Sequence, residues 1–243
     1  MPAPLVVVDA SLDARVSGDR VDLPDAEVHH LRRVLRRSDG AELMVTDGAG
    51  CWADAVLDRS TATLTSPSVT DPAPGPRLHV VQAIGKGRRL DDVVRVVTEL
   101  GVDAVTPLVT ERPEARPTGD RPARLVERLE AVARSAAQQS RRTRLPTVHR
   151  PTTVEQVDPG ALLLVAHPGA KVSLPQQLAS EVVDPQGMVT VVVGPEGGFT
   201  DAEVDVLVAR GGRVVGLGPN VLRTEHAAAV AVAVVAATCG RWS

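Results

Sequence analysis

The sequence predicts an α/β protein in which a small β-rich domain precedes a larger domain built around a mostly parallel sheet. In the first part of the chain, short apolar segments alternate with turn residues, as in small β domains. After residue 77, strand-like and helical segments alternate, which is typical of parallel sheets covered on both faces. The stretch between them, "SPSVTDPAPGPR", holds four prolines and reads as a linker. We therefore expect domains at residues 1–70 and 77–243, with a linker at 71–76.

The first domain is expected to contain three clear strands and one helix. The strands are predicted in "PLVVVDA", "AELMVTDG" and "CWADAVLD". The helix is predicted in "DAEVHHLRRVLRR", because four apolar residues recur there at helical spacing: Val28, Leu31, Val34 and Leu35. Histidines and arginines occupy its other faces. A solvated helix face and an RNA-binding face explain this pattern equally well.

The second domain is expected to alternate strands and helices. Helices are predicted in "RRLDDVVRVVTELG", which Gly101 would end at a C′ position, and in "RPARLVERLEAVARSAAQQS". Thr200 stands three residues before Glu203, a capping box that predicts the start of another helix. An alanine–valine run, Ala227–Ala237, predicts a buried helix. The predicted strands are "RLHVVQAI", "AVTPLVT", "ALLLVAH", "MVTVVVG" and "RVVGLG".

Charge is distributed unevenly along the chain. The formal net charge is −3, which argues against a generally basic nucleic-acid binder. Residues 77–150, however, carry 15 Arg and Lys against 9 Asp and Glu, a net charge of +6, while residues 1–70 and 151–243 each carry −4. This basic block favours contact with a phosphate backbone. Aromatic residues number only three, so base-stacking platforms are not expected and arginine and shape would dominate recognition.

The sequence also bears on the cellular location of the protein. No apolar run approaches the roughly 20 residues that a membrane span needs. The N-terminal "MPAPLVVVDA" lacks the basic leader of a signal peptide. The two cysteines, Cys51 and Cys239, form neither a CxxC pair nor a disulfide framework. We expect a cytoplasmic protein without membrane association.

Two glycine-rich loops carry the strongest local signals. The strand Met188–Val193 runs into Gly194–Gly198, and the strand "RVVGLG" runs into "PNVLRTEHAAA". A third strand, "ALLLVAH", ends at Ala166 and His167. Glycines after a strand allow close approach of a ligand to the backbone, and ligands of open α/β sheets bind at the carboxyl ends of strands. A pocket lined by three strand ends and a set of tight structural turns are the two interpretations of this pattern.

Several ligand classes lose support because their motifs are missing. The chain has neither GxxxxGK[ST] nor GxGxxG, so nucleotide hydrolysis and dinucleotide binding are not predicted. No cluster of His, Cys, Asp and Glu has the spacing of metal ligands, and no GxSxG elbow occurs. Neither a bound metal nor zinc-dependent hydrolysis is expected.

Five motifs in order resemble one known family. They are "HHLRRVLR", "GKGRRLDDVVRVVTELGV", "AAQQSRRTRLP", "VVVGPEGGFTDAE" and "LGPNVLRTEHA". Together they resemble the SPOUT methyltransferases and, within that superfamily, the ribosomal RNA small subunit methyltransferase E family, over nearly the whole chain. Gln138-Gln139 departs from this pattern, since the family usually has Glu-Gln there.

The resemblance implies a fold and an activity. The fold would be an N-terminal PUA-like β-barrel followed by a SPOUT-type parallel-sheet domain with a trefoil knot, assembled as a homodimer. The activity would be methylation of uridine N3 in 16S ribosomal RNA, either naked or in the small ribosomal subunit, with S-adenosyl-L-methionine as cofactor. A non-catalytic ribosomal RNA-binding or assembly factor and a SPOUT methyltransferase acting on transfer RNA are the alternatives.

The resemblance also implies site residues. Arg223 would stabilise the charge that develops on the uracil oxygens, and Glu225 would act as base or orient the substrate. Thr224 would also cap the following helix. The expected cofactor-binding residues are Ala166, His167, Gly194, Pro195, Glu196, Gly198, Leu217, Gly218, Val221, Leu222 and Thr224. The expected RNA-binding residues are His29, His30, Arg32, Arg33, Arg36, Lys86, Arg88, Arg89, Arg141, Arg142 and Arg144.

Overall fold

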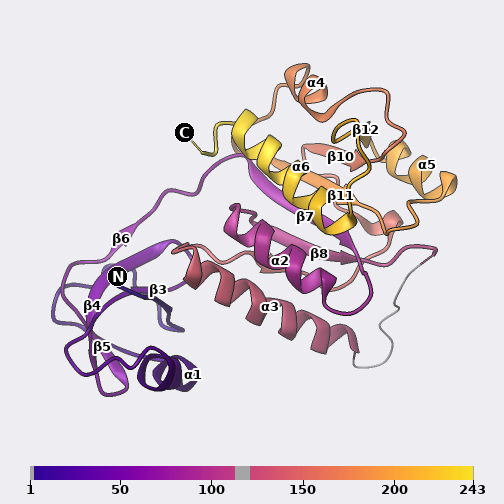
Figure 1. The fold of residues 1–243 in the computed structure, drawn as a ribbon. Coiled ribbons are helices and arrows are strands. Elements are labelled where there is room, and N and C mark those ends of the chain that lie inside the picture. Colours follow the sequence, from indigo (N-terminus) through magenta and orange to yellow (C-terminus); the bar gives the residue numbers. More distant parts are fainter. Residues whose placement is uncertain (1–2, 113–120, 243) are drawn as a thin grey trace. The chain divides into compact units, whose positions relative to one another are not determined.

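The structure is a computed structural model that describes residues 3–112 and 121–242 (Figure 1). The chain forms two compact units. The first comprises residues 1–73 and 134–145, and the second comprises residues 74–133 and 146–243. Residues 134–145 thus belong to the N-terminal unit, although the sequence-based boundaries place them in the second domain. Their assignment depends on contacts between distant parts of the chain, which no local pattern reveals.

The N-terminal unit is built on a six-stranded sheet with the order β1-β3-β4-β5-β2, and β6 pairs with β4. Strands β1 and β3 are parallel and the other pairs are antiparallel. Alternate residues of β4 are buried, so one face of the sheet covers an apolar core. The strands are β1 (Leu5–Val7), β2 (Arg20–Asp22), β3 (Glu42–Thr46), β4 (Cys51–Asp58), β5 (Thr61–Leu64) and β6 (Val69–Thr70).

The helix predicted near residue 30 changes its geometry halfway. It begins as α1 (Asp25–His29) and continues as a π-helical turn over His30–Val34. In that turn the Leu35 amide donates to the carbonyl of His30, five residues back, at 3.0 Å. The wider turn rotates the following side chains away from the core. Leu31 is buried, but Val34 is 61% exposed and Leu35 is 41% exposed, so the prediction of one continuous apolar face is wrong at its end.

Residues 134–145 are held in the N-terminal unit by polar contacts. Gln138 Nε2 donates to Glu27 Oε1 at 2.7 Å, and Thr143 Oγ1 donates to Asp71 Oδ2 at 2.7 Å. The Arg144 guanidinium donates to the carbonyls of Ala49 and Asp71. These bonds give a structural role to the region that the sequence marks as basic.

The second unit has a six-stranded, fully parallel sheet in the order β12-β10-β11-β7-β8-β9. Because every strand runs in the same direction, all carboxyl ends lie along one edge of the sheet. This confirms the predicted parallel sheet. The strands are β7 (Arg77–Ala83), β8 (Ala104–Leu108), β9 (Thr147–Val148), β10 (Leu162–Ala166), β11 (Met188–Val193) and β12 (Arg213–Val215).

Helices cover this sheet and bury its apolar side chains. On one face, Val80 and Val191 belong to a core that includes side chains of α2 and α6. On the other face, Val81 and Val192 pack in a second core with Leu207 of α5. The helical segments of this unit are α2 (Arg89–Glu99), α3 (Arg121–Gln139, whose last residues belong to the N-terminal unit), η2 (Val154–Gln156), α4 (Leu174–Ala179), α5 (Asp201–Ala209) and α6 (Thr224–Thr238).

The local helix signals hold in detail for α2 and α5. The first ends with Gly101 at φ +97°, a left-handed conformation that favours glycine. The second begins with the predicted capping box: Thr200 Oγ1 accepts from the Glu203 amide at 3.3 Å, and Glu203 Oε2 accepts from the Thr200 amide at 2.9 Å. Glu203 Oε1 also accepts from the Glu111 amide at 2.7 Å, so this carboxylate fixes two loops.

Candidate functional site

A large cavity lies where the carboxyl ends of β10, β11 and β12 meet. It has a volume of about 560 Å³ and is bounded by the loops that follow these three strands and by the start of α6. The expected convergence of three strand ends on one pocket is therefore confirmed. The lining residues are Ala166, His167, Pro168, Val193, Gly194, Pro195, Glu196, Gly197, Gly198, Phe199, Leu217, Gly218, Pro219, Asn220, Val221, Leu222, Arg223, Thr224 and Ala227.

The loop after β11 is shaped by its glycines. A side chain at Gly194 would meet the Phe199 ring at 3.0 Å, so only glycine fits there without displacing the ring. Gly198 has φ +74°, and its amide donates to the Pro195 carbonyl at 2.9 Å to close a tight turn. The capping box of α5 follows directly. The loop is thus anchored at both ends and exposes its backbone to the cavity.

The loop after β12 leads into α6 through Arg223. The N-cap of α6 is Arg223, whose carbonyl accepts from the amides of His226 and Ala227 at 3.0 Å. Thr224 is already the first helical residue, so the prediction that its hydroxyl caps the helix is wrong. The helix begins one residue earlier than its sequence suggests, with no side-chain cap, and Glu225 lies in its first turn. Thr224 instead lines the cavity.

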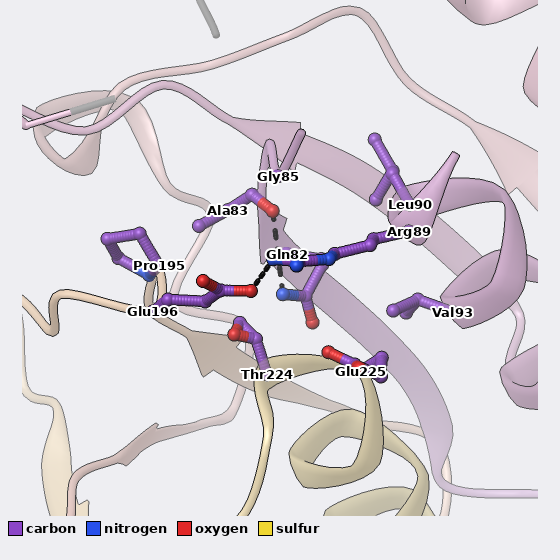
Figure 2. A pocket seen from close by; sticks show the side chains of 10 residues that line it. All are labelled: Gln82, Ala83, Gly85, Arg89, Leu90, Val93, Pro195, Glu196, Thr224 and Glu225. Atoms are coloured by element: carbon purple, nitrogen blue, oxygen red, sulfur yellow. Dashed lines mark hydrogen bonds and ion pairs between the residues drawn. The ribbon is translucent and has the colours of Figure 1, made fainter. Parts of the chain in front are cut away.

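A second, narrow cleft lies beside the large cavity, between β7, α2 and α6 (Figure 2). It has a volume of about 10 Å³, and Pro195, Glu196 and Thr224 line both spaces. Arg89 of α2 forms an ion pair with Glu196 at this cleft. Its remaining lining residues are Gln82, Ala83, Gly85, Leu90, Val93 and Glu225.

Two polar atoms at the narrow cleft are buried without a hydrogen-bond partner. One is Oε1 of Gln82, whose residue is 2% exposed, and the other is Oε2 of Glu225. The Gln82 Nε2 donates to the Ala83 carbonyl at a long 3.5 Å. Buried polar atoms are normally paired, so two unsatisfied acceptors in one small space point to a group that binds there.

The structure gathers the predicted methyl-transfer residues. All eleven expected cofactor-binding residues line the large cavity. Arg223 also lines it, with a side chain that is 81% exposed, and its guanidinium lies 4.0 Å from the Glu225 carboxylate. Sequence reasoning missed Gly197 and Phe199, which belong to the same loop, and it missed Gln82, which no local motif marks.

The predicted RNA-binding residues are spread over both units. Lys86, Arg88 and Arg89 are exposed at the start of α2, where Arg89 also lines the narrow cleft. In the N-terminal unit, His29, His30, Arg33 and Arg36 are exposed. Others are engaged within that unit: Arg32 with Asp39, Arg141 with the Ala3 carbonyl at 3.0 Å, and Arg144 as described above. RNA contact by these side chains stays a prediction.

Within residues 3–112 and 121–242, no group of three or more His, Cys, Asp or Glu side chains is arranged to hold a metal ion. No helix in the same ranges is long and apolar enough to cross a membrane.

Comparison with known proteins finds two family models that match the chain. Residues 72–236 match the family model of an RNA methyltransferase domain, and residues 23–65 match that of an RNA methyltransferase PUA domain. The chain is 36% identical to ribosomal RNA small subunit methyltransferase E of Mycobacterium bovis, covering 100% of this chain and 94% of that protein. It is 35% identical to the protein of the same name from Synechocystis, covering 88% and 71%. A crystal structure of ribosomal RNA small subunit methyltransferase E from Neisseria gonorrhoeae bound to S-adenosyl methionine superposes with a TM-score of 0.82, 27% identity and coverage of 97% and 98%.

Proposed function

Because the chain belongs to the family of RNA methyltransferases that includes ribosomal RNA small subunit methyltransferase E, we propose that it methylates N3 of a uridine in 16S ribosomal RNA, using S-adenosylmethionine. The observation that carries this proposal is the cavity of about 560 Å³, because residues from three separate sequence segments converge there. Its family relatives are named for the small-subunit RNA, and one was solved with the cofactor bound.

The residues around the cavity fit S-adenosylmethionine. The volume lies within the roughly 300–1,000 Å³ of small-molecule sites. Glycine-rich backbone on two sides would approach the adenosine closely, and Leu217 and Leu222 would supply apolar contact. When bound, the cofactor supplies a methyl group carried on a positively charged sulfur.

The protein's own residues must make uridine N3 nucleophilic. That nitrogen carries a proton and is a poor nucleophile until the proton leaves. Glu225, whose Oε2 has no hydrogen-bond partner, would accept the proton on its carboxylate, and Arg223 would stabilise the negative charge that spreads to the uracil carbonyl oxygens. Arg223 is mostly exposed, so its guanidinium is available to a substrate. A stacked uridine must first leave its helix, at a cost of a few kcal/mol.

The partners follow from this activity. The exposed basic side chains of both units would contact phosphates of 16S ribosomal RNA or of the small subunit, and a ribosomal substrate favours a cytoplasmic location. The trefoil knot implied by the SPOUT resemblance is also part of the proposal. In this proposal the second unit carries out the chemistry, and both units contact the RNA.

A homodimer is the proposed assembly. Helix α6 buries Ala228, Val232 and Val235 against its own sheet, while Ala229, Val230 and Ala233 on the other side are only half-buried. Such a continuous apolar stripe fits a subunit contact better than solvent. Ala229→Glu should convert the dimer to a monomer, measured by light scattering at micromolar concentration. A wild-type protein that scatters as a monomer would contradict this assembly.

Cofactor binding is tested by a pair of glycine variants. Gly198→Val introduces a side chain at φ +74° in the cavity wall, and Gly211→Val introduces one at φ +91° outside the cavity. Neither added Cβ meets an atom within 4 Å, so both carry a similar backbone strain. Calorimetry should detect S-adenosylhomocysteine binding to wild type and Gly211→Val but not to Gly198→Val. Absence of binding to folded wild type would refute the proposed function.

A further inference from the structure

The narrow cleft holds a polar side chain to which the proposed reaction has not yet given a task. Gln82 lies at the end of β7, is 2% exposed, and directs its amide into the cleft that Glu225 lines from α6 (Figure 2). Glutamine is costly to bury unless its polar atoms are paired, yet its Oε1 has no partner. Packing alone therefore does not explain this residue.

The orientation of the amide is set by the strand. Nε2 donates to the Ala83 carbonyl, and with the amide reversed two oxygen atoms would face each other there. Oε1 is consequently the atom left for the cleft. Glu225 lines the same cleft and its Oε2 also lacks a partner, so the cleft is bordered by two residues that each have an unpaired acceptor.

The size of the cleft limits what can satisfy them. A volume of about 10 Å³ corresponds to roughly one water molecule. One hydrogen atom shared between the two acceptors, directly or through a single water, would pair both. A protonated Glu225 carboxyl would supply that hydrogen.

We infer that Gln82 is a positioning residue for proton removal: its Oε1 accepts the hydrogen of the Glu225 carboxyl after this group has taken the proton from uridine N3. This inference rests on the proposed function. The proton moves from N3 to the Glu225 carboxylate, the N3 electron pair becomes available for the methyl group, and Gln82 Oε1 holds the proton at Oε2, away from the nucleophile. Gln82 itself touches neither the uridine nor the cofactor.

Gln82→Met tests the role, because it removes the amide and keeps the side-chain length. The single-turnover rate of methyl transfer to 16S ribosomal RNA, at saturating RNA and S-adenosylmethionine, should fall about tenfold, the effect of losing one hydrogen bond. The dissociation constants for S-adenosylhomocysteine and RNA should stay unchanged. Gln82→Glu, which retains an acceptor, should recover part of the rate.

A more acidic substrate separates proton removal from a general structural defect. RNA transcribed with 5-fluorouridine has a more acidic N3–H, because fluorine withdraws electrons from the ring. On this RNA the deficit of Gln82→Met should shrink to less than about threefold, since proton transfer then needs less assistance. A deficit of equal size on both RNAs would overturn the inference.

Two further variants complete the test. In a Glu225→Gln background, Gln82→Met should cause no additional loss, because the carboxyl that it serves is gone. Thr190→Val is the matched control, since it removes another buried, unpartnered polar atom from the neighbouring strand β11 on the opposite face of the sheet, and its rate should equal wild type. A Gln82→Met enzyme as fast as wild type would refute the positioning role while leaving the methyltransferase proposal intact. A wild type that transfers no methyl group would refute the proposed function itself.

Discussion

Strand β7 buries two polar side chains three residues apart, and the two ends of the strand use them differently. His79, in the amino-terminal half, is 5% exposed, and its Nε2 lies 2.7 Å from Thr106 Oγ1, although Nδ1 has no partner. Gln82, near the carboxyl end, faces a cleft next to the large cavity. The same strand thus carries a fold-supporting residue at one end and a residue of the candidate site at the other.

The role of a buried polar group in a parallel sheet depends on its position along the strand. Near the amino end of β7, the buried polar side chain is paired with a residue of a neighbouring strand. At the carboxyl end, such side chains line the spaces where a ligand binds. Position along the strand, together with burial, separates structural from functional candidates, and changes at the amino end should alter stability while changes at the carboxyl end should alter catalysis.

The largest effect on stability is expected from Arg241, which anchors the start of β7. Its side chain is 2% exposed and donates to the Pro74 carbonyl at 2.9 Å, the Gly101 carbonyl at 2.7 Å and Asp103 at 2.9 Å. Arg241→Met should lower the free energy of unfolding by about 3–5 kcal/mol, the usual cost of breaking a buried ion pair. Scanning calorimetry would show this as a lower Tm. An unchanged Tm would mean that this end of the strand needs no such anchor.

Arg223 lies at the opposite edge of the sheet. Its loss should raise the activation free energy of methyl transfer by an amount similar to the loss of folding stability expected for Arg241. Arg223→Ala should lower the single-turnover rate by roughly 10²–10³-fold, the scale for losing one charge-stabilising donor, with little change in Tm. Arg223→Lys should recover little, because an ammonium cannot replace the planar guanidinium. Arg213→Ala is the control, since Arg213 is a half-exposed arginine of β12 paired with Glu181 at 3.4 Å outside the cavity. If Arg223→Ala keeps more than about a third of the wild-type rate, its proposed role is wrong.

The smallest of the three effects concerns pH and His79. Burial, and then the nearby charge of His149, lower the pKa of His79 from 6.5 to about 4, while Asp158 acts in the opposite direction. The unfolded chain therefore binds a proton more readily than the folded one between these values, and stability is lost as pH falls from about 6.5 to about 4. The full loss is about 3 kcal/mol for a shift of this size.

His79→Gln isolates this contribution, because glutamine can keep a hydrogen bond to Thr106 but does not titrate. Urea denaturation at pH 7.5, 6.0 and 5.0, values that bracket the upper part of the transition at about 6.5, should show wild type losing stability relative to the variant as pH falls. Parallel curves for the two proteins would show that His79 is not the buried neutral group described here.

Much of the fold could be predicted from the sequence because its signals are local. Apolar runs marked the strands β7, β8, β10 and β11, and the Thr200–Glu203 pair marked the start of α5. The cavity could be located because glycine-rich loops follow strands that must end at the same edge. These patterns need only a few neighbouring residues to be recognised.

The remaining features could not be predicted, for three different reasons. Gln82 meets Glu225 only because α6 packs back against β7, more than a hundred residues earlier. The π-helical turn after α1 has no sequence signature that sets it apart from an ordinary helix, so the exposure of Val34 was not foreseen. The predicted cap at Thr224 is wrong because α6 begins one residue earlier than expected, and only the backbone dihedral angles decide where the helix begins.

Methylation of uridine N3 in 16S ribosomal RNA can be detected in the products of a reaction with purified protein. Purified protein is incubated with methyl-labelled S-adenosylmethionine and, in separate reactions, with naked 16S ribosomal RNA, small ribosomal subunits and transfer RNA. The RNAs are then digested to nucleosides and analysed by mass spectrometry. We expect labelled 3-methyluridine from 16S ribosomal RNA, free or in the subunit, and none from transfer RNA. Label in any other nucleoside, label in transfer RNA alone, or no transfer by folded, cofactor-binding protein would contradict it.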